Sequence, residues 1–271
     1  MTLVAMVSAK GSPGISTAAL ACTLTWPAPV LLAECDPAGG TLLAGYLSRY
    51  DLPTDRGILP LAGSVLRNTA VQDLPGQVID LDSAKRERMA LTGLSDPAQG
   101  AVLEPAWDAL GEFFLGVARS APSPRPAGHA AGSTPASPAV IADCGRLATA
   151  YAPWPLLRRA DVVLLGVRPK SLVTVSPAVP AIAQLRRELA EVPAILGLML
   201  IGEGMGAREI SRHLMLPVVA QIAWDPRTAS ALNGDGHGRR RGSLMRSAAT
   251  AHRLIEAARI APHASRETVA P

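Results

Sequence analysis

The sequence predicts an α/β protein built on one doubly wound, mostly parallel β-sheet flanked by helices. Three observations support this fold class. Short apolar runs alternate with helical segments along nearly the whole chain, which is typical of parallel sheets with right-handed crossovers. A glycine-containing turn joins the first apolar run to the first helical segment. The length of 271 residues and the 48% content of hydrophobic residues suit a single domain with a substantial core.

The predicted elements follow one another in regular order. Residues 3–7 form an apolar, β-prone run that reads as a buried strand, and residues 16–24 have the composition of a helix packed on a sheet. Further apolar strands are predicted from residue 30, over 139–143, within 160–169 and over 194–201, with helices over 178–189 and 243–260. Strand and helix therefore alternate up to residue 260.

The last predicted helix is preceded by a basic cluster, Arg239, Arg240 and Arg241. Such clusters bind DNA phosphates or anionic membrane surfaces, or remain solvated beside a helix that packs on the sheet. Of the two ligands, DNA is favoured, because the apolar face of the helix has no Trp or Phe. One face of this helix is predicted to be apolar, and it comprises Leu244, Ala248, Ala251, Leu254, Ile255 and Ala258.

The turn after the first strand has the composition of a phosphate-binding loop. Backbone N–H groups in such a loop converge on an anion at a helix N-terminus. Ser16 stands where the pattern G-x-x-x-x-G-K-[ST] places a Mg²⁺-binding hydroxyl. Ile15 replaces the lysine of that pattern, Ala9 replaces its first glycine, and Pro13 removes one N–H donor. The generic pattern alone is equally consistent with an ordinary strand-to-helix turn.

Lys10 favours phosphate binding. The chain has only three lysines against 23 arginines, so a lysine at this point suggests a compact ammonium that contacts phosphate. The loop resembles the deviant Walker A loop, K-G-G-x-G-K-[ST]-[ST], of the MinD/ParA family of P-loop ATPases. Ser12 replaces a glycine of that pattern and Ile15 its second lysine, as in atypical TadZ- and CpaE-like members. The matching residues are Lys10, Gly11, Gly14, Ser16 and Thr17.

The resemblance extends over residues 2–260 and implies a P-loop fold of the SIMIBI class that uses ATP and Mg²⁺. Asp36 matches the switch I carboxylate and Asp143 the aspartate at the end of the Walker B strand. By likeness, these two aspartates and Lys10 would act in catalysis, and Ser16, Asp36 and Asp143 would hold Mg²⁺, partly through water. The nucleotide itself would contact residues of the loop and a segment after the last strand, namely Lys10, Gly11, Ser12, Gly14, Ile15, Ser16, Thr17 and Pro226.

Two departures bear on activity. Ile201-Gly202 stands where the family often has an asparagine that reads adenine, so base specificity stays open. A hydrogen bond to a charged group contributes about 1.5–3 kcal/mol, so the lysine missing at Ile15 would weaken phosphate binding roughly 10- to 150-fold. Hydrolysis is more sensitive to such a loss, because one cation on the transferring phosphoryl group is worth about 10³–10⁵ in rate.

We therefore expect a protein that binds ATP weakly and hydrolyses it slowly or not at all. Its predicted role is that of a nucleotide-dependent homodimer that acts in positioning or partitioning through an unidentified protein partner. Two alternatives remain open, a pseudo-ATPase scaffold for pilus or secretion machinery and an active DNA-partition ATPase.

Composition excludes several other classes. Cys22, Cys35 and Cys144 lack metal-site spacing and are odd in number, which argues against a zinc site or a disulfide scaffold; buried thiols are favoured over a redox role. No apolar run is long enough to cross a bilayer, and no basic leader precedes the first one, so we expect a cytoplasmic protein. Residues 120–138 contain five prolines and predict a disordered insertion, either a tether or a tolerated loop. Residues 261–271 are expected to form a flexible tail.

Overall fold

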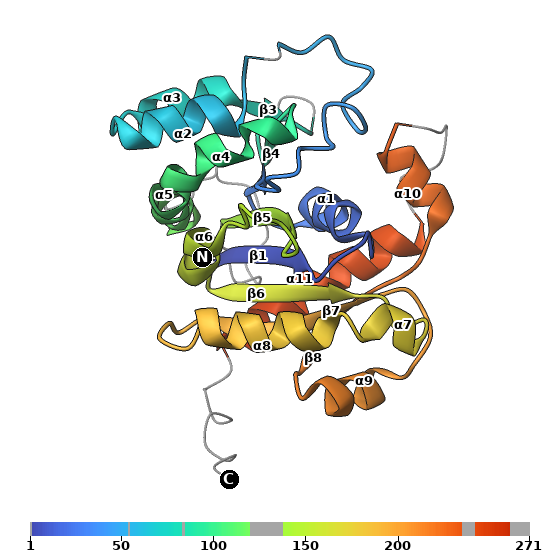
Figure 1. Ribbon diagram of the computed structural model, residues 1–271. Coiled ribbons are helices and arrows are strands. Elements are labelled where there is room, and N and C mark those ends of the chain that lie inside the picture. The colour runs from blue at the N-terminus through green and yellow to red at the C-terminus, as the bar shows by residue number, and fades with distance from the viewer. Residues whose placement is uncertain (1, 54, 83–84, 120–137, 235–241, 261–271) are drawn as a thin grey trace.

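A computed structural model describes residues 2–53, 55–82, 85–119, 138–234 and 242–260. It contains an eight-stranded sheet with the strand order β3-β4-β2-β5-β1-β6-β7-β8 (Figure 1). All neighbouring strands are parallel except β3 and β4, which pair antiparallel. The predicted α/β class with a mostly parallel sheet is thereby confirmed. The strands are β1 (Thr2–Ser8), β2 (Val30–Glu34), β3 (Val78–Asp80), β4 (Arg88–Leu91), β5 (Ala139–Arg146), β6 (Val162–Val167), β7 (Ile195–Ile201) and β8 (Val218–Ile222).

Helices cover both faces of the sheet (Figure 1). One face packs against α1 (Ile15–Thr25), α10 (Pro226–Leu232) and α11 (Ser243–Ile260). The other packs against α2 (Ile58–Leu66), α5 (Trp107–Arg119), α6 (Trp154–Arg159), α8 (Ala178–Glu188) and α9 (Ala207–Leu214). Shorter or peripheral helices are α3 (Ala70–Gln77), α4 (Gly100–Leu103), α7 (Leu172–Val175) and the 3₁₀ turns η1 (Pro97–Gln99) and η2 (Glu104–Ala106).

The central strands are apolar on both sides because the sheet is covered on both sides. Every residue of β1 and β6 is buried, which explains why these strands read as continuous apolar runs and not as alternating ones. Parallel strands expose their carboxyl ends at one edge, where open α/β sheets bind ligands. In β1, β2 and β5 those ends carry Ser8, Glu34 and the Asp143–Arg146 segment, and this edge is the place to look for a site.

The C-terminal helix has the predicted bounds, Ser243–Ile260, but its apolar face is narrower than predicted. Leu244, Ala248, Ala251 and Ile255 are buried, whereas Leu254 is 45% exposed. The helix packs on α1 and β8, and that contact does not extend round to position 254. The expected basic cluster at Arg239, Arg240 and Arg241, the tail 261–271 and the insertion, apart from its last residue, lie outside the described residues.

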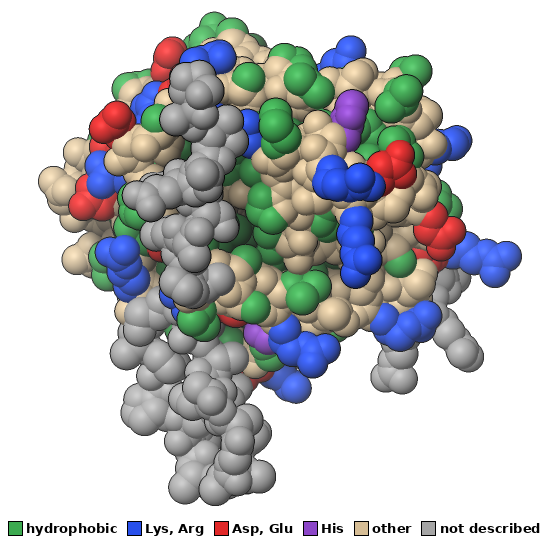
Figure 2. Space-filling model, turned by 90° about the horizontal axis from the view of Figure 1, so that it is seen from below, with side chains coloured by type: hydrophobic (Ala, Val, Ile, Leu, Met, Phe, Trp, Pro, Cys, Tyr) green, Lys and Arg blue, Asp and Glu red, His purple; other side chains and the backbone are tan. Residues whose placement is uncertain are grey.

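The surface seen from below Figure 1 has no dominant charged region among the side chains in view. Figure 2 shows Lys and Arg side chains scattered among acidic, polar and hydrophobic ones on this face. Where the structure describes the chain, none of its helices combines the length and apolar character required to cross a membrane.

Candidate functional site

The loop between β1 and α1 has the backbone of an anion-binding turn. Gly11 and Gly14 both adopt positive φ, of 69° and 101°, a region that glycine enters without steric cost. Gly14 precedes α1, and no side chain caps the helix N-terminus. The first N–H groups of α1 therefore face outward without a side-chain partner, at the positive end of the helix dipole.

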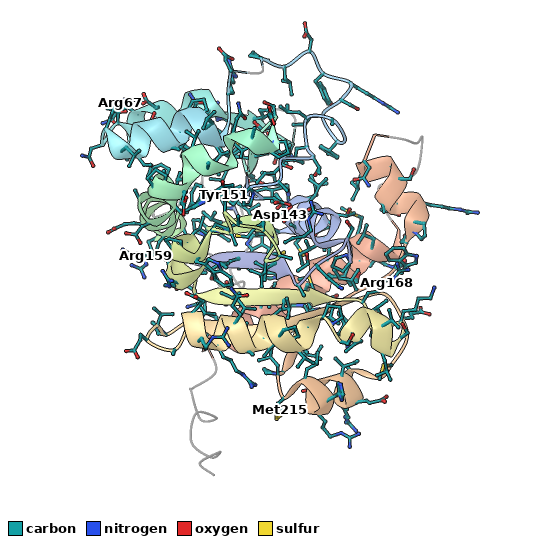
Figure 3. The ribbon with its side chains drawn as sticks, viewed as in Figure 1. Arg67, Asp143, Tyr151, Arg159, Arg168 and Met215 are labelled. Carbon is teal, nitrogen blue, oxygen red and sulfur yellow. The ribbon has the colours of Figure 1, made fainter. Side chains whose placement is uncertain are left out.

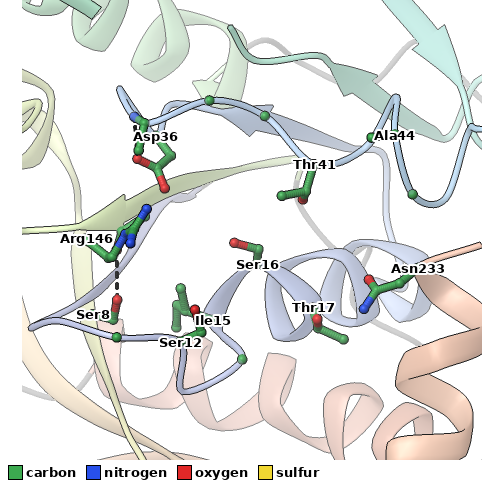
Figure 4. Close-up of a pocket in the computed structure, with 17 residues that line it drawn as sticks. Ser8, Ser12, Ile15, Ser16, Thr17, Asp36, Thr41, Ala44, Arg146 and Asn233 are labelled. Carbon is green, nitrogen blue, oxygen red and sulfur yellow. Dashed lines mark hydrogen bonds between the residues drawn. The ribbon is translucent and has the colours of Figure 1, made fainter. Parts of the chain in front are cut away.

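A cavity of about 520 Å³ lies above this loop (Figure 4), within the size range of small-molecule sites. The loop and the start of α1 form its floor, and the segment after β2 forms the opposite wall. Arg146 lies at one end and Asn233 at the other (Figure 4). Its lining residues are Ser8, Gly11, Ser12, Gly14, Ile15, Ser16, Thr17, Asp36, Ala38, Gly39, Gly40, Thr41, Ala44, Gly45, Gly145, Arg146 and Asn233.

Ile15 lines the cavity but belongs to the hydrophobic core. Its side chain is 4% exposed and packs in the same cluster as Met6 of β1. A Cβ on Gly166 of β6 would lie 2.8 Å from the Ile15 Cδ1 atom, so glycine at 166 leaves the space that the isoleucine fills. The position of the missing lysine is thus occupied by an apolar contact between α1 and the sheet.

Lys10 does not line this cavity. It is exposed at the head of the loop and lines a separate hollow of about 350 Å³. That hollow is formed with residues that follow β5 and with the start of α8, namely Ala9, Leu147, Ala148, Ser176, Pro177, Pro180, Ala181 and Gln184. The structure therefore brings Gly11, Ser12, Gly14, Ile15, Ser16, Thr17 and Asp36 together around one cavity and places Lys10 beside it.

Asp143 is a residue of β5 on the side of the sheet that faces α1 (Figure 3), and it lies beneath the cavity beside Ser16. Its carboxylate accepts a hydrogen bond from the Ser16 hydroxyl and one of 3.1 Å from the Gly145 N–H group. Burial raises the pKa of Asp143 to about 7, and the charges of Glu34 and Asp36 add to the increase while the two hydrogen bonds oppose it. A cation close to this carboxylate would restore its ionised form.

Asp36 and Arg146 face each other at one end of the cavity (Figure 4). The Asp36 carboxylate accepts a 2.8 Å hydrogen bond from the Ala38 N–H group. Burial raises the pKa of Asp36, whereas this hydrogen bond and the positive charge of Arg146 lower it. Arg146 is exposed and is the only lysine or arginine among the described residues that line the cavity.

Glu34 holds the wall of the cavity in place. Its buried carboxylate accepts hydrogen bonds from the N–H groups of Thr41, Leu42 and Gly93, at 2.5, 2.9 and 2.9 Å. Burial raises the pKa of Glu34, and these donors oppose that increase. The segment from Asp36 to Thr41, which lines the cavity, is thereby fixed to the end of β2 and to the loop after β4.

The donor atoms suit Mg²⁺ that arrives with a phosphate ligand. Mg²⁺ prefers oxygen ligands and usually takes only one or two protein groups, together with waters and substrate phosphates. Ser16 and Asp143 supply such a pair, and Asp36 lines the cavity that Ser16 also lines. Within the described ranges there is no group of three or more His, Cys, Asp or Glu side chains placed to hold a metal by themselves. The site thus fits a nucleotide-borne Mg²⁺ better than a resident one.

The two segments expected near adenine, Ile201-Gly202 and the one from Trp224 to Pro226, are not among the residues that line the cavity. Trp224, just after β8, is 46% exposed, and the Arg168 guanidinium stacks 3.7 Å from its ring centroid. A Cβ on Gly202 would come within 3.3 Å of the Trp224 Cβ, so Trp224 packs over Gly202. Pro226 is the first residue of α10 and is not among the residues that line the cavity, whereas Asn233, after the end of this helix, is.

Sequence reasoning missed three polar residues of this site, Glu34, Arg146 and Asn233. Glu34 and Arg146 flank the predicted Asp36 and Asp143 in the segments Glu34-Cys35-Asp36 and Asp143-Cys144-Gly145-Arg146. A charged residue within three positions of a strand-end aspartate was a usable signal for both. Asn233 had no such signal, because it reaches the cavity only through the fold.

Comparisons with solved structures give the same fold at low sequence identity. A ParA family ATPase from Chlorobium tepidum superimposes with a TM-score of 0.65 and 14% identity, covering 92% of this chain and 96% of that one. The cell division ATPase MinD from Pyrococcus furiosus gives 0.66 and 16%, covering 94% and 98%. An ATP complex of McdA from Cyanothece gives 0.59 and 15%, covering 86% and 87%. No protein-family model matches the chain, and no curated protein sequence matches it. The fold is therefore that of MinD and ParA ATPase structures.

Proposed function

We propose that this protein is an atypical, MinD/ParA-like cytoplasmic nucleotide-binding protein that binds ATP with Mg²⁺ weakly and hydrolyses it slowly or not at all. It acts as a homodimer that positions or partitions a cargo through protein partners. One observation carries the proposal. The glycine loop, the open N-terminus of α1, Ser16 and Asp36 border a single cavity at the carboxyl edge of the sheet, and Asp143 lies beneath it in contact with Ser16.

The evidence for phosphate binding comes from the backbone of the loop, because position 15 holds isoleucine and not lysine. The positive φ values of Gly11 and Gly14 shape the turn, and the α1 N-terminus supplies N–H donors and a favourable dipole. The similar McdA structure contains ATP. We expect the buried Ile15 to weaken binding by the factor of about 10 to 150 that one charged hydrogen bond is worth.

Weak hydrolysis follows from the same residue. A cation that contacts the transferring phosphoryl group contributes about 10³–10⁵ in rate, and the Ile15 side chain packs in the core. Asp36 remains as the group that would orient water, and Asp143 with Ser16 as the groups that would hold Mg²⁺. The protein would thus use bound nucleotide as a conformational signal more than as fuel.

Dimerisation through bound nucleotide is supported by the position of Lys10. Its side chain lies outside the cavity of its own chain, on an exposed hollow beside the loop. A lysine placed there can reach the phosphates of a second copy, which is the role that the loop resemblance gives it. Proteins with this fold also form complexes with other proteins, as in the MinC:MinD complex from Aquifex aeolicus.

A pseudo-ATPase scaffold without nucleotide is the second candidate. The observation that favours it is the packing of Ile15 against Gly166, which replaces a phosphate contact by a core contact. Non-specific DNA binding, as in an active partition ATPase, depends on Arg239, Arg240 and Arg241 and stays a prediction. Membrane binding is not expected.

Calorimetry of the full chain with ATP and Mg²⁺, combined with phosphate release and light scattering, tests the proposal. We expect binding, a phosphate release rate at least about 10³-fold below that of the Ile15→Lys variant, and dimers only with nucleotide. Lys10→Ala should abolish the dimer and retain binding by the monomer. Lys85→Ala, a change of an exposed lysine after β3, serves as the matched control. Absence of ATP binding at millimolar concentration would favour the scaffold, and rapid turnover by the native chain would favour an active ATPase.

A further inference from the structure

The pairing of β5 with β1 is irregular at the point where the cavity begins. Met6 is opposite Asp143, but Ser8 is opposite Arg146, so two steps along β1 correspond to three along β5. The extra residue lies at Cys144–Gly145, and Gly145 adopts a positive φ of 61°. This is a β-bulge, a feature that re-aims side chains and is common beside active sites.

The bulge changes the face of the sheet on which Arg146 lies. Along a regular strand, Arg146 would share a face with Cys144, which packs in the core on the α5 side. With the bulge it pairs with Ser8, and both residues line the cavity on the α1 side. Two hydrogen bonds stabilise the bulge. The Ser8 hydroxyl donates one of 3.2 Å to the Gly145 carbonyl, and the Leu147 N–H group donates one of 2.9 Å to the Ser8 carbonyl.

Position 145 favours glycine for two reasons, its positive φ and the lack of space for a side chain next to Asp36. A Cβ on Gly145 would overlap the Asp36 carboxylate, so the absence of a side chain lets Asp36 sit directly on the bulge. The Asp36 carboxylate and the Arg146 guanidinium consequently face the same end of the cavity (Figure 4). Within the described part of the chain, that guanidinium makes no hydrogen bond or ion pair.

We propose that Arg146 binds the terminal phosphates of the nucleotide in cis and replaces the lysine that is missing at Ile15. This inference rests on the proposed function. Arg146 lies at the Ser8–Ser12 end of the cavity, whereas Thr17 and Asn233 line the other end (Figure 4). A guanidinium presents a planar fork of N–H donors that matches two phosphate oxygens, so one arginine can provide both charge and orientation.

The charge of the site favours this assignment. Glu34, Asp36 and Asp143 place three carboxyl groups at or beneath the cavity, and they repel a nucleotide that carries several negative charges. Lys10 faces a different hollow. Arg146 is thus the cation that the described chain offers to an anion held by its own loop.

Calorimetric titration of the full chain with ATP–Mg²⁺ and, separately, with AMP tests the inference. Arg146→Ala should weaken ATP binding roughly 10- to 150-fold and leave AMP binding within about two-fold, because AMP lacks the terminal phosphates. Arg146→Lys should recover part of the affinity, since it keeps the charge and loses the fork. The matched control is Arg208→Ala, which removes an exposed arginine on α9 and should change neither constant.

The outcomes separate this inference from the proposed function. Native binding of ATP that Arg146→Ala leaves unchanged would overturn the role of Arg146 and leave the proposed function intact. Equal losses for ATP and AMP, together with a lower melting temperature, would show a structural role and would also overturn it. If the native chain binds no nucleotide, the proposed function fails and the inference fails with it.

Discussion

Replacing the buried carboxyl group of Asp143 by an amide is expected to stabilise the ligand-free protein above pH 7 and to change little near pH 4. Burial raises the pKa of Asp143 from 3.8 to about 7 in the folded chain. Between these values the folded state holds a proton that the unfolded state releases. The stabilisation by the neutral form is therefore complete below pH 4 and is lost as the pH rises through 7.

The size of the effect follows from the shift. About three pKa units at 1.36 kcal/mol each set a ceiling of about 4 kcal/mol on the gain of Asp143→Asn over the native chain at pH 8. The amide oxygen can still accept the hydrogen bonds from Ser16 and from the Gly145 N–H group. The repulsion of Asp143 by Glu34 and Asp36 is already included in this shift, so it adds nothing to the ceiling.

Urea unfolding followed by circular dichroism at pH 4.5, 6 and 8 measures this difference. The control is Asp51→Asn, at an exposed position, and its stability should follow that of the native chain at each pH. Saturating ATP–Mg²⁺ should reverse the order at pH 8, because the nucleotide stabilises a chain that binds it and the amide is a poorer Mg²⁺ ligand. A stability difference of the same size at pH 4.5 and pH 8 would refute a titrating Asp143.

Three further changes test the packing around the cavity. Ile15→Ala should lower the free energy of unfolding by about 2–5 kcal/mol, because its side chain is buried against Gly166; a loss below 1 kcal/mol in urea denaturation would show that the site is not packed. Gly145→Ala should cost more than about 1 kcal/mol, because φ is positive and the new Cβ meets Asp36, and calorimetry should show weaker ATP binding, so native values for both would contradict the bulge geometry. Arg168→Ala should lower stability by about 0.5–1 kcal/mol through the lost contact with the Trp224 ring, and unchanged tryptophan emission would argue against that contact.

Much of the fold was predictable because buried parallel strands leave a strong local signal. The strands that became β1, β5, β6 and β7 were recognisable as apolar runs, and their predicted bounds agree with the structure to within about three residues. The final helix was predicted with its correct ends. The predicted apolar face of this helix was wrong at Leu254, which is exposed. Periodicity identifies the apolar side of a helix, but it does not show how much of that side the neighbouring elements α1 and β8 cover.

The geometry of the site depends on contacts that are distant in sequence and was less predictable. The direction of Arg146 is set by a bulge against β1, some 138 positions earlier in the chain, and no local pattern fixes that register. Glu34 receives a hydrogen bond from Gly93, which is 59 positions away. The sequence likewise predicted Lys10 to be a phosphate ligand without showing that its own chain places it outside the cavity.

A loop with two lysines would supply both a cation that binds nucleotide in cis and a cation that contacts it in trans. In this chain Arg146 and Lys10, which line different hollows, would divide these two roles. Arg146 and the next residue, Leu147, line different hollows. Arg146 lines the cavity, whereas Leu147 lines the hollow that also contains Lys10. If Arg146 binds nucleotide in cis and Lys10 contacts it in trans, affinity and dimerisation depend on different side chains. Substituting Arg146 would then weaken both processes, because the dimer requires bound nucleotide, whereas substituting Lys10 would weaken dimerisation alone. On this proposal, the segment after Asp143 would link nucleotide occupancy of the cavity to the hollow that holds Lys10.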